Sequence, residues 1–489
     1  MTVQPATANL LAWLVMLPLA AAVLTMLLPL RLRAAASLVL LAPMTLLALM
    51  LGAALATHGP FVLALGGWAT PLGIALQADG PAVGMTLLTV AISVPCAIHA
   101  AAYLRGHAEA EYFWALFWFL WASLNTIWMS TDIFNLYVGI ELLGLAAVGL
   151  VALRGDAEAL AAAMRYLLAA LLGSLAYLIG VALLYGGHGS LSLAHLAQTD
   201  HAQATTAVAL AAMSLGLALK TALFPLHAWL PPAHGGALTP VSALLSALVI
   251  KASFFIMLRL WFALAPPGLS TAATLLGLLG AFAVFWGGWK ALRQSRLKHL
   301  VAYSTVAQIG YLFLFFPLAI GTGEAAARLA WDGTMLMLIS HALAKAAMFL
   351  AAGNLILAIG SPRIADLAGI GRYRQFSLLS FGIAGVGIMG LPPSGGFGAK
   401  WLLMQSALAG GGWLWVAVLI GGGLLSAAYV FKVFRHAFIE GPKRDRFEDP
   451  PAALEITALV LALVSLMIGL AAHGPLTWLR LGTPFGVSE

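Results

Sequence analysis

The residues best suited to chemistry in this 489-residue chain are charged side chains set inside long apolar segments. They are Glu141 in VGIELLG, Lys220 in LALKTALF, Lys251 in ALVIKASFF, Lys345 in SHALAKAAMFL and Lys400 in GFGAKW. A charge at the centre of a bilayer costs about 2.5–3.5 kcal/mol on insertion scales, so such residues usually face the protein interior and mark an ion path. A buried ammonium either pairs with an anion or gives up its proton. One glutamate cannot pair with four lysines, so the pattern predicts lysines that exchange protons.

Histidines near these lysines could extend the path. His341 lies four residues before Lys345, on the same helix face, and histidine titrates near neutral pH. Secondary candidates lie near a lysine or a helix break: His227, His234 and His299. The alternative for each histidine is a hydrogen-bonded packing residue. The alternative for each lysine is a side chain that snorkels to the membrane interface. For Arg259, near the outer end of its span, snorkelling is the favoured interpretation.

These residues must be positioned by membrane-spanning helices. The chain is 62% hydrophobic and 8% charged, with a mean hydropathy of +0.99, whereas soluble proteins are about a quarter charged. The apolar segments are long enough to cross a bilayer. We expect about fourteen spans, at 10–30, 35–57, 80–102, 112–130, 132–152, 163–185, 206–226, 237–262, 271–289, 299–318, 333–358, 376–406, 411–432 and 452–473.

Charge and cysteine content limit the partners. The net charge of +7 comes from basic residues in alternate loops, and the segments 58–80 and 186–205 between them have none. This is the positive-inside pattern. It predicts a multi-pass protein with both termini outside and a charged inner segment at 441–450, and it indicates no nucleic-acid partner. The single cysteine, Cys96, excludes an internal disulfide and an iron–sulfur cluster ligated by cysteines of this chain alone.

Two spans are interrupted by proline. Pro225 interrupts LALKTALFPLHAWLPPAH, and Pro392 with Pro393 interrupts GLPPSGGFGAKW. Proline removes an amide donor, and a broken helix at membrane depth persists only beside protein or a wet cavity. Paired breaks in two halves indicate an inverted repeat with the ion path between them. We expect water to be the main partner of the freed carbonyl groups. The alternative is an ordinary helix kink.

The chain has no sequence motif for a cofactor, a metal or a catalytic reaction of its own. It contains no phosphate loop, no dinucleotide fingerprint in its strand context and no metal-spaced Cys/His cluster. We therefore expect no catalytic residues, no cofactor and no metal. A chain with only protonatable groups can move protons, but it needs another protein to drive them.

Six segments resemble the proton-translocating antiporter family shared by respiratory complex I, Mrp-type sodium/proton antiporters and membrane-bound hydrogenases. They are GGWATPLGIALQADG (66–80), DIFNLYVGIELLG (132–144), KTALFPLHAWLPPAHGGALTPVSALLSALVIK (220–251), LKHLVAYSTVAQIGY (297–311), HALAKAAMFLAAG (341–353) and GLPPSGGFGAK (390–400). One departure is Pro232, where the family usually has aspartate.

The resemblance implies an all-α, polytopic membrane protein with about fourteen helices, two of them discontinuous. It implies one transmembrane domain over 1–489 that contains two inverted five-helix repeats, spans 4–8 (112–262) and spans 9–13 (271–432). It also implies a proton pathway. The residues matched to that pathway are Glu141 and its partner Lys220, the connecting Lys251, the pair His341 and Lys345, and the terminal Lys400.

Two functions follow from the resemblance. The first is the proton-conducting, D-type subunit of a multisubunit cation/proton antiporter in the bacterial inner membrane, which moves protons and, as the second candidate ion, sodium. DIFNLYV and TPVSALLSALVIK favour it. The alternative is an antiporter-like, proton-pumping subunit of a redox enzyme of the complex I or hydrogenase type. Both require the lipid bilayer and other membrane subunits as partners.

Overall fold

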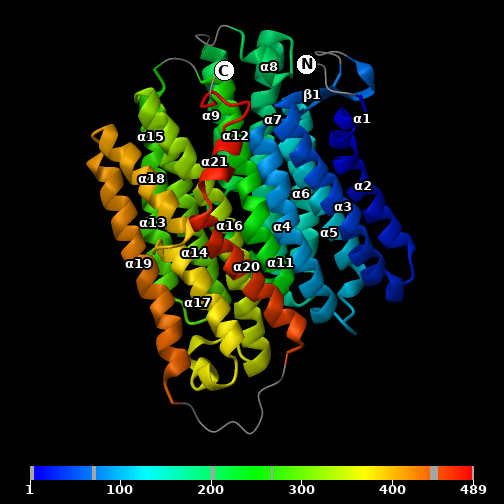
Figure 1. Ribbon diagram of the computed structural model, residues 1–489, viewed down its shortest axis with the longest axis vertical. Helices are drawn as coiled ribbons and strands as arrows, with labels where there is room; N and C mark the ends of the chain where they lie inside the picture. Colours follow the sequence, from blue (N-terminus) through cyan, green and yellow to red (C-terminus); the bar gives the residue numbers. More distant parts are fainter. Residues whose placement is uncertain (1–4, 69–72, 200–203, 266–267, 441–449, 487–489) are drawn as a thin grey trace.

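The fold is a bundle of long helices, shown in Figure 1 as a computed structural model. The structure describes residues 5–68, 73–199, 204–265, 268–440 and 450–486. Most of the charged inner segment predicted at 441–450 therefore lies outside the described residues. The described ends of the chain, marked N and C, lie at the same end of the bundle (Figure 1). An even number of membrane crossings requires this arrangement.

The first half of the bundle begins with three helices, followed by five spans. The opening helices are α2 (Leu10–Leu27), α3 (Leu30–His58) and α4 (Gly80–Tyr103), with the one-turn α1 (Pro5–Ala8) before them. The next spans are α5 (Ala110–Met129), α6 (Ile133–Ala152), α7 (Ala157–His188), the pair α9 (Ala204–Lys220) and α10 (Leu230–Gly236), and α11 (Thr239–Leu244), which a π-helical turn (Leu245–Val249) joins to α12 (Ile250–Leu264). The one-turn α8 (Leu193–Leu196) precedes α9.

The second half has the same order of long and broken spans. Its helices are α13 (Ser270–Arg293), α14 (Leu297–Phe313) with α15 (Phe315–Ala319), α16 (Glu324–Ile359), the pair α17 (Gln375–Met389) and α18 (Gly395–Ala409), α19 (Trp413–Phe438), α20 (Ala452–Leu470) and the short α21 (His473–Leu479). Short 3₁₀ turns cover Ile364–Leu367 and Ile370–Arg372.

The predicted spans agree with these helices. Within the described ranges, eleven helices are long and apolar enough to cross a membrane, and α9 and α17 are shorter apolar helices that end at a break. The tryptophan-rich α5, 20 residues long, completes the fourteen predicted segments. The all-α polytopic fold is confirmed. The structure also contains an antiparallel hairpin of β1 (Phe61–Ala64) and β2 (Ala75–Ala78), which was not predicted.

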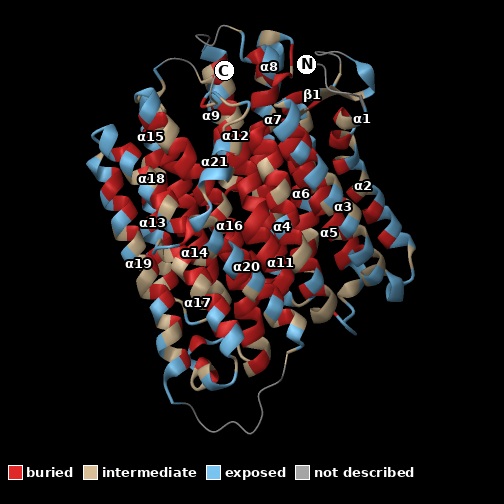
Figure 2. Cartoon of the chain, viewed as in Figure 1, coloured by how far each residue is buried: buried red, intermediate tan, exposed pale blue. Residues whose placement is uncertain are grey.

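Burial follows position in the bundle (Figure 2). Residues 236–258 and most of α16 are buried, because these segments lie at the centre. The outer helices expose large apolar side chains, such as Trp413 at 72%, Leu424 at 69% and Phe431 at 68%. Exposed apolar surface of this extent marks contact with lipid or with other membrane subunits. The four lysines inside spans are buried in the bundle, whereas Glu141 is partly exposed.

Candidate functional site

The first charged pair joins α6 to the end of α9. The Nζ atom of Lys220 lies 3.5 Å from Oε1 of Glu141, and the two side chains are 8% and 24% exposed. Glu141 also accepts a hydrogen bond from the hydroxyl of Ser174 on α7. Gly144 and Gly173 flank Lys220, and a Cβ at Gly173 would crowd its aliphatic stem. The proximity expected of this pair is confirmed.

Lys220 stands directly before the first break. Ala222 has a positive φ of 59°, and the amide of Leu223 donates to the carbonyl of Ala218 at 3.0 Å. A left-handed residue followed by this six-to-one bond is a Schellman ending. The indole of Trp229 donates to the carbonyl of Leu219 at 2.9 Å. Nothing in the sequence indicated this donor, and the expectation of water as the partner is wrong for the Leu219 carbonyl.

The second break has the same ending. Gly390 has a φ of 80°, and the amide of Leu391 donates to the carbonyl of Val386 at 3.1 Å. Lys400, from the first turns of α18, reaches back and donates to the carbonyls of Ile388 at 3.1 Å and Met389 at 3.0 Å. Its ammonium also lies 4.6 Å from the ring centroid of Tyr311. A protein side chain again satisfies the freed carbonyls.

Both predicted breaks are confirmed as non-helical segments, between Lys220 and Leu230 and between Met389 and Gly395. Each contains a cis peptide bond, Phe224–Pro225 in the first and Pro392–Pro393 in the second.

Lys251 lies in the first turn of α12, just beyond the π-helical turn. Its side chain is fully buried and donates to the backbone carbonyl of Ser246. The hydroxyls of Ser246 and Thr305, on α14, lie 2.9 Å apart. A small cavity between Lys220 and α12 is lined by Tyr166 and Ser253 among others, so it joins the first pair to the helix that carries Lys251.

Lys345 and His341 occupy the centre of α16. Lys345 is fully buried and donates to the carbonyl of Val301 at 3.1 Å and to the hydroxyl of Ser304. His341 is 2% exposed, and neither ring nitrogen has a hydrogen-bond partner among the described residues. Lys251, Lys345 and Lys400 all act on it electrostatically. His341 therefore lies among three lysines, with both nitrogens free for water.

Within the described ranges, Lys251, Lys345 and Lys400 form no ion pair with a carboxylate within 4.0 Å. Their ammonium groups are held by carbonyl and hydroxyl oxygens. The shortage of carboxylates noted in the sequence thus appears in the structure.

One helix, α14, supplies oxygen atoms or polar side chains beside all three of these lysines. The residues are Val301, Ser304, Thr305, Gln308 and Tyr311. Gln308 donates to the carbonyl of Ile388 at 3.1 Å, the same oxygen that accepts from Lys400, and to the hydroxyl of Ser426 on α19. These residues were not among the predicted site residues. Their signal was present: polar side chains three or four residues apart in an apolar helix share one face.

The secondary histidines lie in different surroundings. His234 is fully buried, stacks on Phe349 with centroids 4.7 Å apart, and has no partner for either ring nitrogen among the described residues. His299 lines a cavity of about 500 Å³. His227 packs against Phe224 and Tyr303, and the cation that acts on it is Lys290. Only His234 therefore stands between a cavity and the buried lysines.

That cavity, here called the inner cavity, gathers loops that are distant in sequence. Its polar lining consists of Tyr103, His107, Glu109, Arg154, Glu158, Thr239, Arg296, Lys298 and His299. Arg296 pairs with Glu158 at 2.5 Å, and Lys298 donates to the carbonyl of Ala237 at 2.9 Å. Gly235, next to His234, and Gly353, one turn beyond Phe349, also line it. The inner cavity thus ends about two turns of α16 from Lys345.

Two arginines at the other end of the bundle form ion pairs. Arg259, expected to snorkel, instead places Nη2 at 2.9 Å from Oδ2 of Asp79 and is 14% exposed, so that expectation is wrong. Arg480 pairs with Asp332 on α16, and its hydrogen bonds to that carboxylate raise the pKa of Arg480. Within the described ranges, no group of three His, Cys, Asp or Glu side chains could hold a metal ion.

Broken helices and buried lysines on this bundle define an antiporter-like membrane subunit, and the comparisons agree. Residues 130–426 match the NADH:quinone oxidoreductase/Mrp antiporter transmembrane family. The chain belongs to that family.

Individual relatives come from both kinds of complex. The chain is 35% identical to the N-type subunit of NADH-quinone oxidoreductase from Desulforudis audaxviator over 84% of this chain and 85% of the relative. It is 28% identical to the D-type subunit of the Na(+)/H(+) antiporter from Alkalihalophilus pseudofirmus over 84% and 82%. Among solved structures, it is similar to a chain of the archaeal membrane-bound sulfane sulfur reductase, a respiratory membrane complex. There the TM-score is 0.89, the identity 28% and the coverage 96% of both chains.

Proposed function

We propose that this chain conducts protons along Glu141, Lys220, Lys251, His341, Lys345 and Lys400, as one part of a multisubunit complex in the bacterial inner membrane. The observation that carries the proposal is that three buried lysines are held by carbonyl and hydroxyl oxygens and not by carboxylates. An ammonium with neutral partners in a dry interior is costly, whereas the neutral amine is not. Each lysine can therefore pass a proton on.

Glu141 acts as the switch of this path. While its carboxylate is 3.5 Å from Lys220, the charged form of that lysine is stabilised. When the pair separates, Lys220 can release its proton toward Lys251 through the small cavity that Ser253 lines. His341 and the polar face of α14 then connect Lys251, Lys345 and Lys400. His234 and His299 are proposed as the branch from the inner cavity.

Replacement of Glu141 tests the proposal. In the intact complex reconstituted in vesicles, Glu141→Gln should reduce proton flux, followed with a fluorescent pH probe, to the background of empty vesicles. The matched control is Glu455→Gln on α20, because Glu455 is also a partly buried carboxylate that accepts from a serine, Ser377, at 2.7 Å. Equal flux in Glu141→Gln and Glu455→Gln, with both complexes fully assembled, would refute the role of Glu141.

The kind of parent complex has two candidates. The 35% identity with a component of NADH-quinone oxidoreductase supports a redox-driven complex, which we place first. The 28% identity with the D-type subunit of an Na(+)/H(+) antiporter, together with DIFNLYV and TPVSALLSALVIK, supports the cation/proton antiporter, with sodium as the exchanged ion. Purification in mild detergent decides between them: iron–sulfur or nickel subunits identify the redox complex, and small membrane subunits alone identify the antiporter.

We further propose that 112–262 and 271–432 are inverted repeats. The two broken spans supply the support, because each ends its first half with a positive-φ residue and a six-to-one hydrogen bond, at Ala222 and Gly390. The orientation is also a proposal. Loops with Arg154, Arg296 and Lys298 meet at the inner cavity, so the positive-inside rule puts that end in the cytoplasm and both termini outside.

A further inference from the structure

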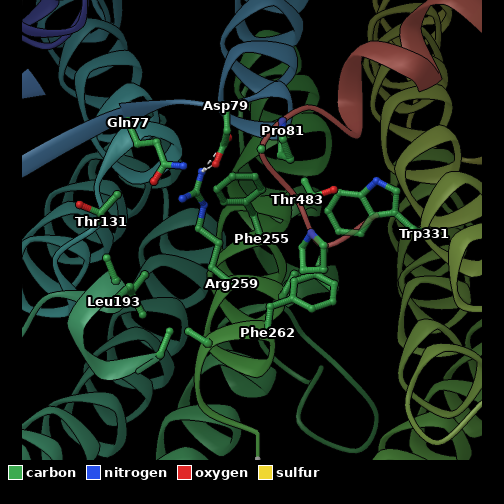
Figure 3. A pocket seen from close by; sticks show the side chains of 16 residues that line it. Gln77, Asp79, Pro81, Thr131, Leu193, Phe255, Arg259, Phe262, Trp331 and Thr483 are labelled. Carbon is green, nitrogen blue, oxygen red and sulfur yellow. Dashed lines mark hydrogen bonds and ion pairs between the residues drawn. The ribbon is translucent and has the colours of Figure 1, made fainter. Parts of the chain in front are cut away.

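A second cavity lies at the end of the bundle that holds both termini. Its volume is about 270 Å³, which gives room for several water molecules. Residues from β2, α12, α16 and the C-terminal segment line it, and its polar members are Gln77, Asp79, Thr131, Arg259 and Thr483. Figure 3 shows the Asp79–Arg259 pair at its wall, facing Phe262, Trp331 and Thr483. We call it the outer cavity.

In the ion pair at its wall, the Arg259 guanidinium has hydrogen-bond partners within the described part of the chain at Nη2 but not at Nε. Arg259 uses Nη2 for both carboxylate oxygens of Asp79, at 3.0 and 2.9 Å, and for the carbonyl of Trp128 at 3.2 Å. Its Nε is buried without a hydrogen-bond partner among the described residues. A buried donor without a partner is destabilising, so no hydrogen bond from these residues fixes this side of the guanidinium.

Phe255 lies between Lys251 and Arg259 along α12. Lys251, Phe255 and Arg259 follow one another at four-residue spacing on α12, so their side chains are stacked along one side of the helix. Phe255 is 2% exposed and lines the outer cavity. The guanidinium of Arg259 lies 4.9 Å from its ring centroid, and Trp128 packs against its edge at 5.1 Å.

Lys251 and Arg259 are eight residues apart on α12, so their backbone positions are separated by about 12 Å along the helix axis. On the Lys251 side of the ring are the hydrogen-bonded Ser246 and Thr305, and on the other side is the outer cavity.

We propose that the outer cavity is the outward proton port of this chain and that the Phe255 ring is the barrier between it and Lys251. The inference rests on the proposed proton-conducting function. A rotamer change of Phe255 lets water join the Lys251 amine to the Asp79 carboxylate. The proton leaves the lysine nitrogen, binds a carboxylate oxygen and passes to water in the cavity. No other bond changes.

Asp79 is suited to a transient proton. Burial raises the pKa of its carboxyl, and the Arg259 guanidinium together with the amide of Ala82 opposes that rise. Movement of Arg259 away from Asp79 removes much of the opposition, so the carboxyl takes a proton; return of Arg259 expels it. Arg480 and Asp332 pair elsewhere on the same end of the bundle, outside the residues that line the cavity.

Near the inner cavity, α16 has a similar succession of a lysine, an aromatic residue and a cavity-lining residue. On α16, Lys345, Phe349 and Gly353 also follow at four-residue spacing, with Gly353 in the wall of the inner cavity. Phe349 stacks on His234. Lys345 thus faces an aromatic barrier toward the inner cavity, and Lys251 faces one toward the outer cavity. The two lysines have opposite access, as vectorial transport requires.

Truncation of Phe255 tests the barrier. In the complex reconstituted in vesicles, Phe255→Ala should increase passive proton leak by about tenfold, a barrier about 1.4 kcal/mol lower. The matched control is Phe254→Ala. Phe254 is also fully buried on α12, but it packs against Phe313 and Phe316 and does not line the cavity. Leak that is equal in the two variants would overturn the proposal.

A second measurement does not require the truncated variant to fold. In a Cys96→Ala background, Leu258→Cys lines the outer cavity and Leu260→Cys does not, although both leucines are buried. A charged methanethiosulfonate reagent added to the outer side should modify Leu258→Cys about tenfold faster than Leu260→Cys. Equal rates would mean that the cavity is closed to the outside and is not a port.

The two proposals fail differently. If the chain does not conduct protons, the wild-type complex has no flux that Glu141→Gln removes. If only the port is misassigned, that flux and its loss remain, whereas Phe255→Ala matches Phe254→Ala and Leu258→Cys matches Leu260→Cys.

Discussion

The buried lysines have partners of different chemistry. Lys220 is 3.5 Å from a carboxylate, whereas Lys345 is held by the carbonyl of Val301 and the hydroxyl of Ser304. A hydroxyl can both donate and accept, so Ser304 can hydrogen-bond the lysine in either protonation state. A carboxylate, by contrast, favours only the charged lysine. On the proposed path, these neutral partners keep Lys345 exchangeable.

This difference predicts the effect of removing one hydroxyl. Ser304→Ala should reduce proton flux several-fold and leave the amount of assembled complex unchanged, because a buried serine contributes only about 1 kcal/mol through its hydrogen bond. Ser380→Ala is the control, since Ser380 is also fully buried but bonds only to the carbonyl of Phe376 in its own helix. The measurement is pH-probe flux in vesicles, normalised to complex content. A Ser304→Ala flux equal to that of the control would remove Ser304 from the path.

At the scale of the element, the end of α17 combines a backbone requirement with a functional contact. Gly390 has a φ of 80°, and a Cβ there would meet the side chain of Lys400. For residues other than glycine, adopting this left-handed conformation costs about 1–2 kcal/mol. The same substitution therefore has two separable consequences, one for stability and one for the position of Lys400.

A pair of glycine substitutions separates them. Gly390→Ala and Gly189→Ala should lower the thermal stability of the complex similarly, by about 1–2 kcal/mol each, because Gly189 at the end of α7 also has a positive φ, of 65°. A Cβ at Gly189 meets nothing within 4 Å. Only Gly390→Ala should then reduce proton flux. Equal flux in the two variants would show that the position of Lys400 is not required.

Elements were predicted better than contacts between them. Apolar segments and prolines are local signals, so the spans and both breaks could be inferred from the sequence. The Asp79–Arg259 pair joins residues 180 positions apart, so no local sequence pattern predicts it. The β-hairpin was missed because its strands have only four residues each. In the sequence, Trp229 does not differ from other aromatic residues of a membrane protein. Only the fold brings its indole to the carbonyl of Leu219.

At the scale of the whole molecule, the two cavities distinguish the proposed cytoplasmic end of the bundle from the proposed outer end. The inner cavity has a basic rim, and the outer cavity is lined in part by the C-terminal residues Gly482, Thr483 and Pro484. Of the site residues named from the sequence, His299 lines the inner cavity, and the role of each residue stays a prediction. The oxygens of α14 could have been found from residue spacing, but the cavities depend on loops that are far apart in sequence.

The proposed orientation can be tested with fusions at the C-terminus. Alkaline phosphatase, active only outside the cytoplasm, should be active when fused after Glu489, and a green fluorescent protein that folds only inside should be dark there. Fusions after Glu440, the residue that follows the last inward-running helix, should give the opposite pair of signals. A fluorescent C-terminal fusion would reverse the proposed orientation and exchange the inner and outer cavities.

The shared use of α14 has a consequence for how the chain binds protons. The polar face of α14 touches the surroundings of all three lysines: it holds Lys345 directly, bonds Ser246 beside Lys251 through Thr305, and shares the Ile388 carbonyl with Lys400 through Gln308. A proton bound at one lysine therefore changes the surroundings of the other two. Interacting groups titrate as a set, with macroscopic steps that belong to no single residue. The coupling is also reciprocal, since a shift of α14 that favours protonation at one lysine must be felt in both directions. The lysines should therefore behave as one cooperative proton reservoir, whose occupancy a neighbouring protein of the complex could read or set by moving one helix.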